Sequence, residues 1–407
     1  MKSVPEIRFP GFTDLWKERK LGDVCSRVQG NDGRMELPTL TISAANGWMK
    51  QEDRFSGNIA GKEQKNYTLL HKGELSYNHG NSKLAKYGTV FSLQTYEEAL
   101  VPRVYHSFKV EIGNADFIEY YFATKIPDRE LKKLISSGAR MDGLLNIGYN
   151  DFMGIKIMLP STSEQVKIAE YFRSLDYLIT LHQRELDEIK ALKKCMLLKM
   201  FPKNGEKVPE IRFPGFTDSW EQRKLSEIAD KVTEKNAGLQ YIETFTNSAE
   251  FGIISQRDFF DHDIAKMSSL GGYYIVRNED FVYNPRISTS APVGPINRNK
   301  LGRIGVMSPL YTVFRPHDVD TTYLEYFFKS KYWHSFMNFN GDSGARSDRF
   351  SIKDSVFFEM PIPLPYIEEQ RKIGEHLTQL DHLITLQERK CKVLQKLKKC
   401  MLQKMFV

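Results

Sequence analysis

The chain repeats itself, and this repeat is the strongest constraint on its fold. Residues 4–24 read VPEIRFPGFTDLWKERKLGDV and residues 208–228 read VPEIRFPGFTDSWEQRKLSEI, which agree at 15 of 21 positions. A second pair begins EQVKIAEYFRSLDYLITLHQRE at residue 164 and EQRKIGEHLTQLDHLITLQERK at residue 369. The regions between these matched ends agree far less. A period of 369 − 164 = 205 residues is too long for a solenoid repeat and predicts a tandem domain duplication.

The overall composition fits a folded chain with two domains of ordinary size. The sequence has 407 residues, of which 41% are hydrophobic and 27% are charged, as in soluble globular proteins. It has no apolar run near the roughly 18 residues of a membrane span, and its start, MKSVPEIRFP, lacks the apolar core of a signal peptide. The four cysteines form no CxxC pair. We therefore expect a cytoplasmic protein without disulfides, bound metal or membrane contact.

Each half ends in a long stretch with the residue spacing of a coiled-coil helix. Seam positions recur at alternating spacings of four and three residues, and neither stretch contains an internal proline. The first seam comprises Ile168, Phe172, Leu175, Ile179, His182, Leu186, Ile189, Lys193 and Met196, and the second comprises Ile373, Leu377, Leu380, Ile384, Gln387, Cys391, Leu394, Lys398 and Met401. This pattern predicts two helices, each roughly 55 Å long, that pair as an antiparallel coiled coil.

Polar residues at four seam positions limit the expected pairing. Lys193 and Lys398 lie near the end of each helix, where apolar residues would be needed to continue a coiled coil. We expect the KKCML sequences that begin at these positions to leave the partner helix and meet other surfaces. His182 and Gln387 occupy equivalent positions and are expected to help set the register rather than to bind a metal.

The two middle regions predict mixed α+β domains. Short apolar runs alternate with turn signals, and residues 118–122 and 324–328 (IEYYF and LEYFF) are amphipathic helical stretches in both halves. Before each middle lies a lead segment, PEIRFPGFTDxW, whose prolines and glycine disfavour regular structure; a short turn capped by Asp14 is expected to lead to the following RKL. The expected organisation is two domains with their lead segments, each followed by one helix: residues 1–160, 161–203, 204–365 and 366–407.

The sequence offers no convincing catalytic motif. Residues 57–63 (GNIAGKE) lack the spacing and the serine or threonine of a phosphate loop. Residues 127–132 (PDRELK) place their acidic side chains too close together for a PD…ExK nuclease, so a helix surface is expected there. Residues 284–286 (NPR) lack the second proline and the aromatic residue of an amino-methyltransferase. We therefore interpret the chain as a non-catalytic binding protein.

Basic and amide side chains beside glycines suit DNA as a ligand of the middle regions, and the alternative for such loops is an ordinary solvated surface. Arginine can bind guanine through O6 and N7, asparagine can bind adenine, and lysine can hold phosphates. The net charge of +7 is compatible with such a ligand. The candidate DNA contacts are Asn78, Asn81, Lys83, Lys86, Arg140, Arg286, Ser288, Arg298, Arg303, Arg346 and Arg349.

Two of these arginines lie in matched Ser-Gly-Ala-Arg sequences. Arg140 and Arg346 are separated by 346 − 140 = 206 residues, close to the period of the repeat. We predict that each contacts DNA from its own domain. The alternative is that the turn is structural in both copies, with glycine supplying the turn and the arginine pairing with an internal carboxylate.

The whole chain resembles the DNA-specificity subunits of bacterial type I restriction-modification enzymes. The resemblance rests on two diverged middles, each followed by a long heptad helix. It also rests on the helix starts P-x-x-x-E-Q-x-K-I at residues 160–168 and 365–373, and on W-x-x-x-K-L at residues 16–21 and 220–225.

This resemblance implies that each middle is a target recognition domain that reads one half of a bipartite DNA site. It implies that the paired helices separate the two domains with pseudo-twofold symmetry. It further implies two modification subunits, which bind S-adenosylmethionine and methylate adenine, and restriction subunits, which cleave unmodified DNA; ATP and Mg²⁺ are expected on partner subunits and no cofactor on this chain. Half-site centres about 10–10.5 bp apart would leave an unread spacer of roughly 5–8 bp. The alternative function is a coiled-coil adaptor whose two middles bind proteins.

Overall fold

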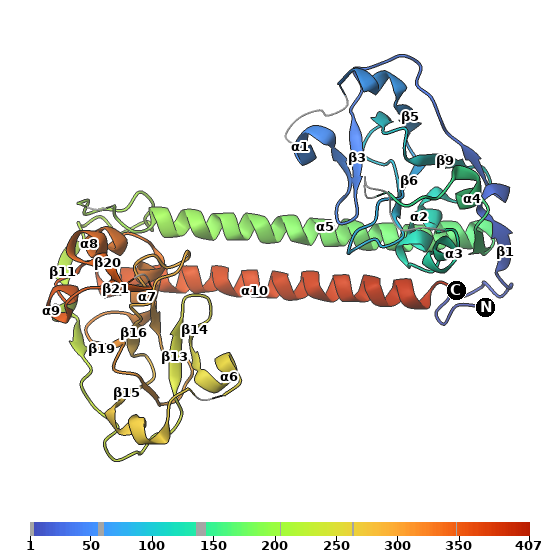
Figure 1. Cartoon of the computed structure of the whole chain (residues 1–407). Helices are drawn as coiled ribbons and strands as arrows, with labels where there is room; N and C mark the ends of the chain where they lie inside the picture. Colours follow the sequence, from blue (N-terminus) through green and yellow to red (C-terminus); the bar gives the residue numbers. More distant parts are fainter. Residues whose placement is uncertain (1–3, 56–60, 136–143, 204, 263, 347) are drawn as a thin grey trace. The chain divides into compact units, whose positions relative to one another are not determined.

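A computed structural model describes residues 4–55, 61–135, 144–203, 205–262, 264–346 and 348–407. The chain forms two compact units, a first unit of residues 1–183 with 389–407 and a second unit of residues 184–388. Each unit contains one middle region and part of both long helices (Figure 1). The predicted boundaries treat each long helix as a separate segment. In the structure, each helix is divided between the two units, at residues 183/184 and 388/389.

The first unit is an α+β domain, as predicted. Its central sheet is antiparallel, with strand order β2-β9-β6-β7, and smaller pairs join β1 to β10, β3 to β4 and β5 to β8. Its elements are β1 (Lys17–Lys20), β2 (Cys25–Arg27), β3 (Leu40–Ser43), β4 (Gly47–Lys50), α1 (Gln51–Phe55), β5 (Thr68–His71), β6 (Leu75–Asn78), β7 (Thr89–Ser92), β8 (Glu98–Val101), β9 (His106–Val110), α2 (Ala115–Ala123), α3 (Asp128–Lys133), α4 (Tyr149–Met153), β10 (Lys156–Leu159) and the start of α5 (Thr162–Lys199).

The second unit repeats this topology. Its central sheet has the order β12-β19-β16-β17, with matching smaller pairs β11-β22, β13-β14 and β15-β18, and β20 pairs with β21 in a hairpin. Its elements are β11 (Glu221–Lys224), β12 (Ala229–Lys231), β13 (Phe245–Ser248), β14 (Gly252–Ser255), α6 (Gln256–Phe260), β15 (Tyr274–Val276), β16 (Phe281–Tyr283), β17 (Ile296–Arg298), β18 (Gly305–Met307), β19 (Thr312–Pro316), α7 (Thr321–Lys329), α8 (Trp333–Asn340), β20 (Asp342–Arg346), β21 (Arg349–Ser351), α9 (Asp354–Phe357), β22 (Pro361–Leu364) and the start of α10 (Ile367–Lys404).

Aromatic side chains dominate the core of each unit. In the first unit Tyr77, Phe117 and Phe152 are fully buried, and the rings of Tyr77 and Phe152 stack with centroids 4.3 Å apart. Phe281 and Phe314 stack at 5.5 Å in the second unit. Truncating one such side chain to alanine typically lowers the free energy of unfolding by about 3–5 kcal/mol. These aromatic rings therefore contribute strongly to the stability of each unit.

The RK of the RKL sequence after each lead segment ends a β-strand that the sequence did not predict. Residues 17–20 form strand β1, which pairs antiparallel with β10, and the matching residues 221–224 form β11, which pairs with β22. Both strands are solvent-exposed along most of their length. Their partner strands lie about 140 residues later in the sequence, so no local pattern marks them as strands.

The two long helices pair with each other within each unit, as predicted, and the partners run antiparallel. Lys398 near the end of α10 contacts Asp176 near the start of α5, and Lys193 near the end of α5 contacts Asp381 near the start of α10. The predicted seam positions are the less exposed ones: Ile168, Phe172, Leu175, Leu186, Ile373, Leu377 and Leu380 are buried, and Ile179, Ile384 and Leu394 are half-buried. Within the described ranges, no helix combines the length and apolar character needed to traverse a lipid bilayer.

The expectation that the pairing stops at the two seam lysines is wrong. Lys193 and Lys398 remain in the seam, where each forms an ion pair with an aspartate of the other helix instead of an apolar contact. The same aspartates accept hydrogen bonds from tyrosines of α2 and α7: Tyr120 to Asp176 at 2.8 Å, and Tyr326 to Asp381 at 2.7 Å. Each lysine–aspartate–tyrosine cluster therefore ties both long helices to one domain.

A buried ion pair explains why the lead segments and helix starts are nearly identical in the two halves. Arg8 of the first lead segment donates to Glu164 at 2.7 Å, and Arg212 of the second donates to Glu369 at the same distance. Both glutamates are almost fully buried, and an unpaired buried charge would be costly. The arginine and the glutamate therefore have to be kept together.

The lead segment also binds the end of the other long helix. The backbone N–H of Ile7 donates to the carbonyl of Lys404 in α10, and that of Ile211 donates to the carbonyl of Lys199 in α5, both at 2.9 Å. The ring of Phe406, just beyond α10, packs against Trp16 of the first unit. These contacts define the frame: lead segment, helix start and helix end, present once in each unit.

Candidate nucleic-acid interface

Each unit has a hollow lined by polar and apolar side chains at the same place on its domain. The first groove has a volume of about 630 Å³ and the second about 520 Å³. The first groove is lined by Thr41, Gln51, Arg54, Asn78, Asn81, Arg103 and Tyr105, among others. The second groove is lined by Thr246, Gln256, Phe259, Asn284, Arg286, Ser288, Tyr311 and Arg349, among others. The two sets come from equivalent elements, so the duplication produced two versions of one surface.

The floors of the two grooves use the same residues for the same contacts. The hydroxyl groups of Thr41 and Tyr105 lie 2.9 Å apart in the first groove, and those of Thr246 and Tyr311 lie 3.3 Å apart in the second. Each tyrosine lies just before a strand of the central sheet, β9 or β19. Its contact with the threonine holds the floor hairpin, β3-β4 or β13-β14, next to that strand. The shared floor therefore gives both grooves one shape.

A glutamine in each floor has an unused acceptor. Gln51 is 1% exposed and Gln256 is 7% exposed, and the side-chain carbonyl oxygen of each has no hydrogen-bond partner among the described residues. Buried polar atoms are normally hydrogen-bonded. The orphaned oxygens therefore favour a ligand or an ordered water that brings a donor to this place in both grooves.

Asn78 shapes its loop instead of presenting a free amide. Its side-chain Nδ2 donates to the carbonyl of Ile42 at 3.2 Å, and its Oδ1 accepts from the N–H of Gly80 at 3.0 Å. Asn284 makes the same two bonds in the second unit, to the carbonyl of Asn247 and from the N–H of Arg286. Asn78 therefore helps to shape its loop, and whether it also contacts a base stays a prediction.

Ser288 has a similar local role at the edge of the second groove. Its hydroxyl accepts from the N–H of Ala291, and Ser82 accepts from the N–H of Ala85 in the matching turn of the first unit. Three predicted residues nearby, Asn81, Lys83 and Lys86, are exposed. Asn81 lines the first groove, whereas Lys83 and Lys86 lie on the same loop outside its lining.

Two predicted arginines are engaged by carboxylates of their own domain. Arg298 is only 10% exposed at its side chain and pairs with Glu325 at 2.7 Å and with Glu279 at 2.9 Å. Arg303 donates from Nε to Oε2 of Glu243 and from Nη2 to Oε1 of Glu243, both at 2.8 Å. Both arginines therefore stabilise their own domain, and the proposed interface does not include them.

Arg286 and Arg349 line the second groove, and Arg140 and Arg346 remain undecided. Arg140 lies outside the described residues. Arg346 ends strand β20 and pairs in the backbone with Arg349, but its side chain lies outside the described part of the structure. Whether either arginine contacts DNA stays a prediction.

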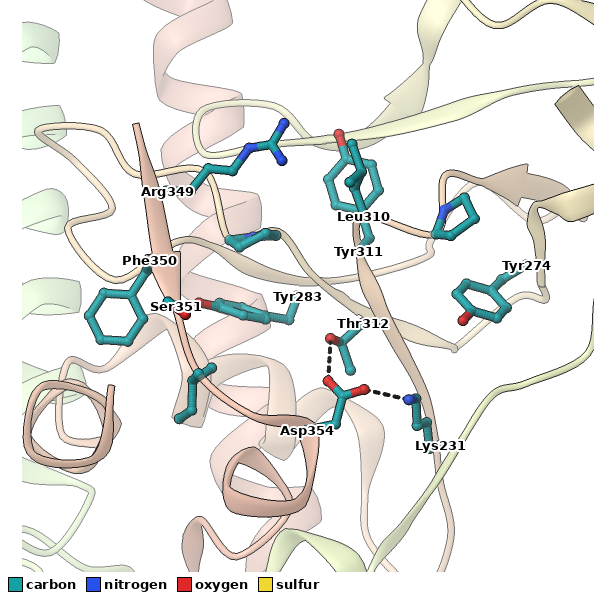
Figure 2. Close-up of a pocket in the computed structure, with 13 residues that line it drawn as sticks. Lys231, Tyr274, Tyr283, Leu310, Tyr311, Thr312, Arg349, Phe350, Ser351 and Asp354 are labelled. Atoms are coloured by element: carbon teal, nitrogen blue, oxygen red, sulfur yellow. Dashed lines mark hydrogen bonds and ion pairs between the residues drawn. The ribbon is translucent and has the colours of Figure 1, made fainter. Parts of the chain in front are cut away.

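A second hollow of about 460 Å³ adjoins the second groove (Figure 2). Leu310, Tyr311 and Arg349 line both hollows. At the other side of this hollow Lys231 forms an ion pair with Asp354, which also accepts from Thr312 at 3.2 Å. Arg349 therefore lies between the two hollows and contributes to the lining of both.

Arg54, Arg103 and the two glutamines line the grooves but were not among the residues predicted from the sequence. The sequences QEDRF at residues 51–55 and QRDFF at residues 256–260 match at three positions, and this pattern could have located the groove floor. Arg103 lies in the turn before β9 without any local motif. Among the described residues, no group of three or more histidines, cysteines or carboxylates is suited to hold a metal ion.

Comparison with known proteins agrees with the duplicated architecture. The chain matches the family described as type I restriction modification DNA specificity domain twice, over residues 13–191 and 217–396. The type I restriction enzyme MjaVIII specificity subunit of Methanocaldococcus jannaschii is 24% identical over 298 residues, which cover 70% of this chain and 68% of that protein. The fold is shared with the type I restriction-modification system S subunit from M. genitalium, with a TM-score of 0.56 at 11% identity over 99% of both chains. The chain therefore belongs to the type I restriction-modification DNA specificity family.

Proposed function

We propose that this chain is the DNA-specificity subunit of a type I restriction-modification enzyme and that each groove reads one half of a bipartite double-stranded site. The observation that carries this proposal is the pair of grooves with a shared floor and different walls. A shared floor keeps one mode of docking on DNA, while different walls contact different base edges. Two unlike readers in one chain suit an asymmetric site.

The subunit itself is not catalytic in this proposal. It directs partner subunits: two modification subunits that methylate adenine, and restriction subunits that cleave unmodified DNA. The duplicated frame supports two identical partners, because it presents the same contacts once in each unit. Leu178 and Leu181 of α5 are 38% and 36% exposed, and the equivalent Leu383 and Leu386 of α10 are 47% and 46% exposed. These leucine pairs are the proposed docking points, since an apolar side chain exposed at the same place on both helices favours one repeated partner surface.

Single-molecule sequencing of adenine methylation tests this function directly. Cells with the partner subunits are compared with and without the gene for this chain. The expected result is one split motif, with an unread gap of roughly 5–8 bp, that disappears with the gene. A continuous motif, or no change on deletion, contradicts the proposal.

Salt dependence separates DNA recognition from a protein-binding adaptor. If the grooves bind DNA, the affinity of the purified complex for duplex DNA falls steeply with salt. The logarithm of the binding constant should decrease linearly with the logarithm of the salt concentration. An adaptor would show weak DNA binding at all salt concentrations and would keep its protein partners.

A further inference from the structure

We infer that the two grooves read their half-sites with arginines at complementary positions: Arg54 and Arg103 in the first groove, Arg286 and Arg349 in the second. This inference rests on the proposed function and adds to it the residues that set specificity. At each of the four positions around the groove, one unit has an arginine where the other has a neutral residue.

Two of the four positions are aligned by the shared floor. Arg54 of α1 follows Gln51 by three residues, and Phe259 of α6 follows Gln256 by three residues. Both Arg54 and Phe259 line their grooves. The first unit therefore presents a cation where the second presents an aromatic ring.

The turn before β9 gives the second position. Arg103 precedes Tyr105 by two residues, and Pro309 precedes Tyr311 by two residues. Because both tyrosines make the same bond to a floor threonine, Arg103 and Pro309 occupy the same place. Arg103 is exposed and lines the first groove.

The other two positions are aligned by one backbone bridge in each unit. Gly80 pairs with Leu144 in the first unit, and Arg286 pairs with Arg349 in the second. The matched amide bonds of Asn78 and Asn284 place Gly80 and Arg286 at the same step of the loop. Here the first unit has neutral residues and the second has two arginines.

The four groove arginines keep hydrogen-bonding capacity for a ligand. Arg54 uses one Nη for the carbonyl of Ile42 at 2.6 Å. Arg286 is 73% exposed at its side chain, and its ion pair with Asp348 is 3.9 Å long. Among the described residues, no carboxylate lies within ion-pair distance of Arg103 or Arg349. Arg298 and Arg303, by contrast, have their guanidinium groups on internal glutamates.

The chemistry of arginine points to guanine as the base it reads. The guanidinium fork matches the O6 and N7 acceptors of guanine in the major groove. We therefore assign at least one arginine-contacted G·C pair to each half-site.

The test uses the full chain assembled with its modification partners. Arg54→Ala, Arg103→Ala, Arg286→Ala and Arg349→Ala are each read by methylation sequencing and by binding to duplexes in which single G·C pairs are exchanged. Each variant is expected to lose discrimination at a G·C position of its own half-site by about 5- to 150-fold, while the other half-site stays unchanged. The matching Arg→Lys variants should also lose discrimination, because lysine keeps the charge but not the fork.

Two surface arginines outside the grooves serve as matched controls. Arg19→Ala in β1 and Arg223→Ala at the matched position of β11 remove the same charge from the first and second unit and should leave the motif unchanged. A uniform loss of affinity with an unchanged motif assigns the groove arginines to phosphates and overturns the inference. An unchanged motif with unchanged affinity overturns it too.

The outcome for the wild-type complex separates this inference from the proposed function. If the wild-type complex methylates no split motif, the proposed function fails. If it methylates a split motif that all four variants read normally, only the assignment of the arginines fails. Thermal unfolding of each variant identifies any that misfold, and for these the Arg→Lys form decides the result.

Discussion

The two units keep identical contacts in the frame and exchange chemistry in the domains. Arg8–Glu164 and Arg212–Glu369 are the same ion pair at the same distance. In the domain interior, however, Glu119 of α2 accepts from Ser92 at 2.7 Å, whereas the equivalent Glu325 of α7 binds cations. The difference teaches that the frame keeps one set of contacts in both units, while each domain interior only has to satisfy its own buried polar groups.

A second exchange lies beside the grooves. Lys231 and Asp354 form an ion pair in the second unit. The equivalent residues of the first unit are Arg27 and Tyr149, and the guanidinium of Arg27 lies 4.4 Å from the centroid of the Tyr149 ring. An ion pair has been replaced by a cation–π contact at one position of one fold. Such exchanges alter the domain surface without altering the strand order.

The largest expected effect compares the two helix glutamates. Burial raises the pKa of Glu119. Burial also acts to raise the pKa of Glu325, but Lys329 and Lys300 outweigh it and lower the pKa to about 2. Glu325→Gln leaves the buried Arg298 without its closest carboxylate and should cost about 3–5 kcal/mol of unfolding free energy. Because burial raises the pKa of Glu119 and so works against its charged form, Glu119→Gln should change stability by less than about 1 kcal/mol.

Chemical denaturation of the two glutamine variants measures this difference. The second-unit variant should unfold at clearly lower denaturant concentration than wild type, and the first-unit variant should unfold close to it. Equal losses in the two variants would show that the interiors are energetically equivalent despite their different partners.

The second prediction concerns the frame, where equal effects are expected. Asp176→Asn and Asp381→Asn each weaken one lysine–aspartate–tyrosine cluster. Because the aspartates are partly exposed, each change should cost about 1–2 kcal/mol. Calorimetry should show losses of similar size from the two variants. Glu170→Gln and Glu375→Gln, at matched exposed positions of α5 and α10, are the controls, and unequal losses from the aspartates would contradict an equivalent frame.

The third prediction sharpens the comparison through pH. Burial lowers the pKa of His334 in α8 from 6.5 to about 4. The unfolded chain therefore binds the proton first, so the stability contributed at pH above 6.5 is lost as pH falls towards about 4. His334→Gln should flatten this acid dependence of the melting temperature of the second unit. His262→Gln, at an exposed position of the same unit, should not, and equal curves for both variants would remove His334 as the cause.

The fold was predictable from the sequence wherever the determining pattern is local. The heptad spacing placed the first helix close to its observed bounds, Thr162–Lys199, because a helix repeats every 3.6 residues along the chain. The Arg8–Glu164 ion pair joins residues 156 positions apart, and no local pattern reports such a contact. The matched sequences showed that both segments mattered, but not that they bind each other.

The candidate site was less predictable, because hydrogen-bond satisfaction depends on tertiary structure. Asn78 and Arg298 have the residue types of DNA contacts, but Asn78 uses both ends of its amide within the loop and Arg298 is buried among glutamates. Arg54 and Arg103 come from separate segments that meet only in the folded groove. A sequence shows which side chains could bind a base, and the fold decides which of them have donors left.

The smallest expected effect on stability should have the largest effect on assembly. Leu178→Ala combined with Leu181→Ala removes exposed side chains and should change the unfolding free energy by no more than about 0.5 kcal/mol. If the leucines bind a modification subunit, the doubly substituted chain should bind one copy where the wild type binds two, and sedimentation analysis distinguishes these masses. Leu383→Ala with Leu386→Ala should produce the same loss from the other helix. Full assembly in both variants would place the partner on another face of the frame, and loss in only one would mean that the two units, although matched in sequence, are not used alike.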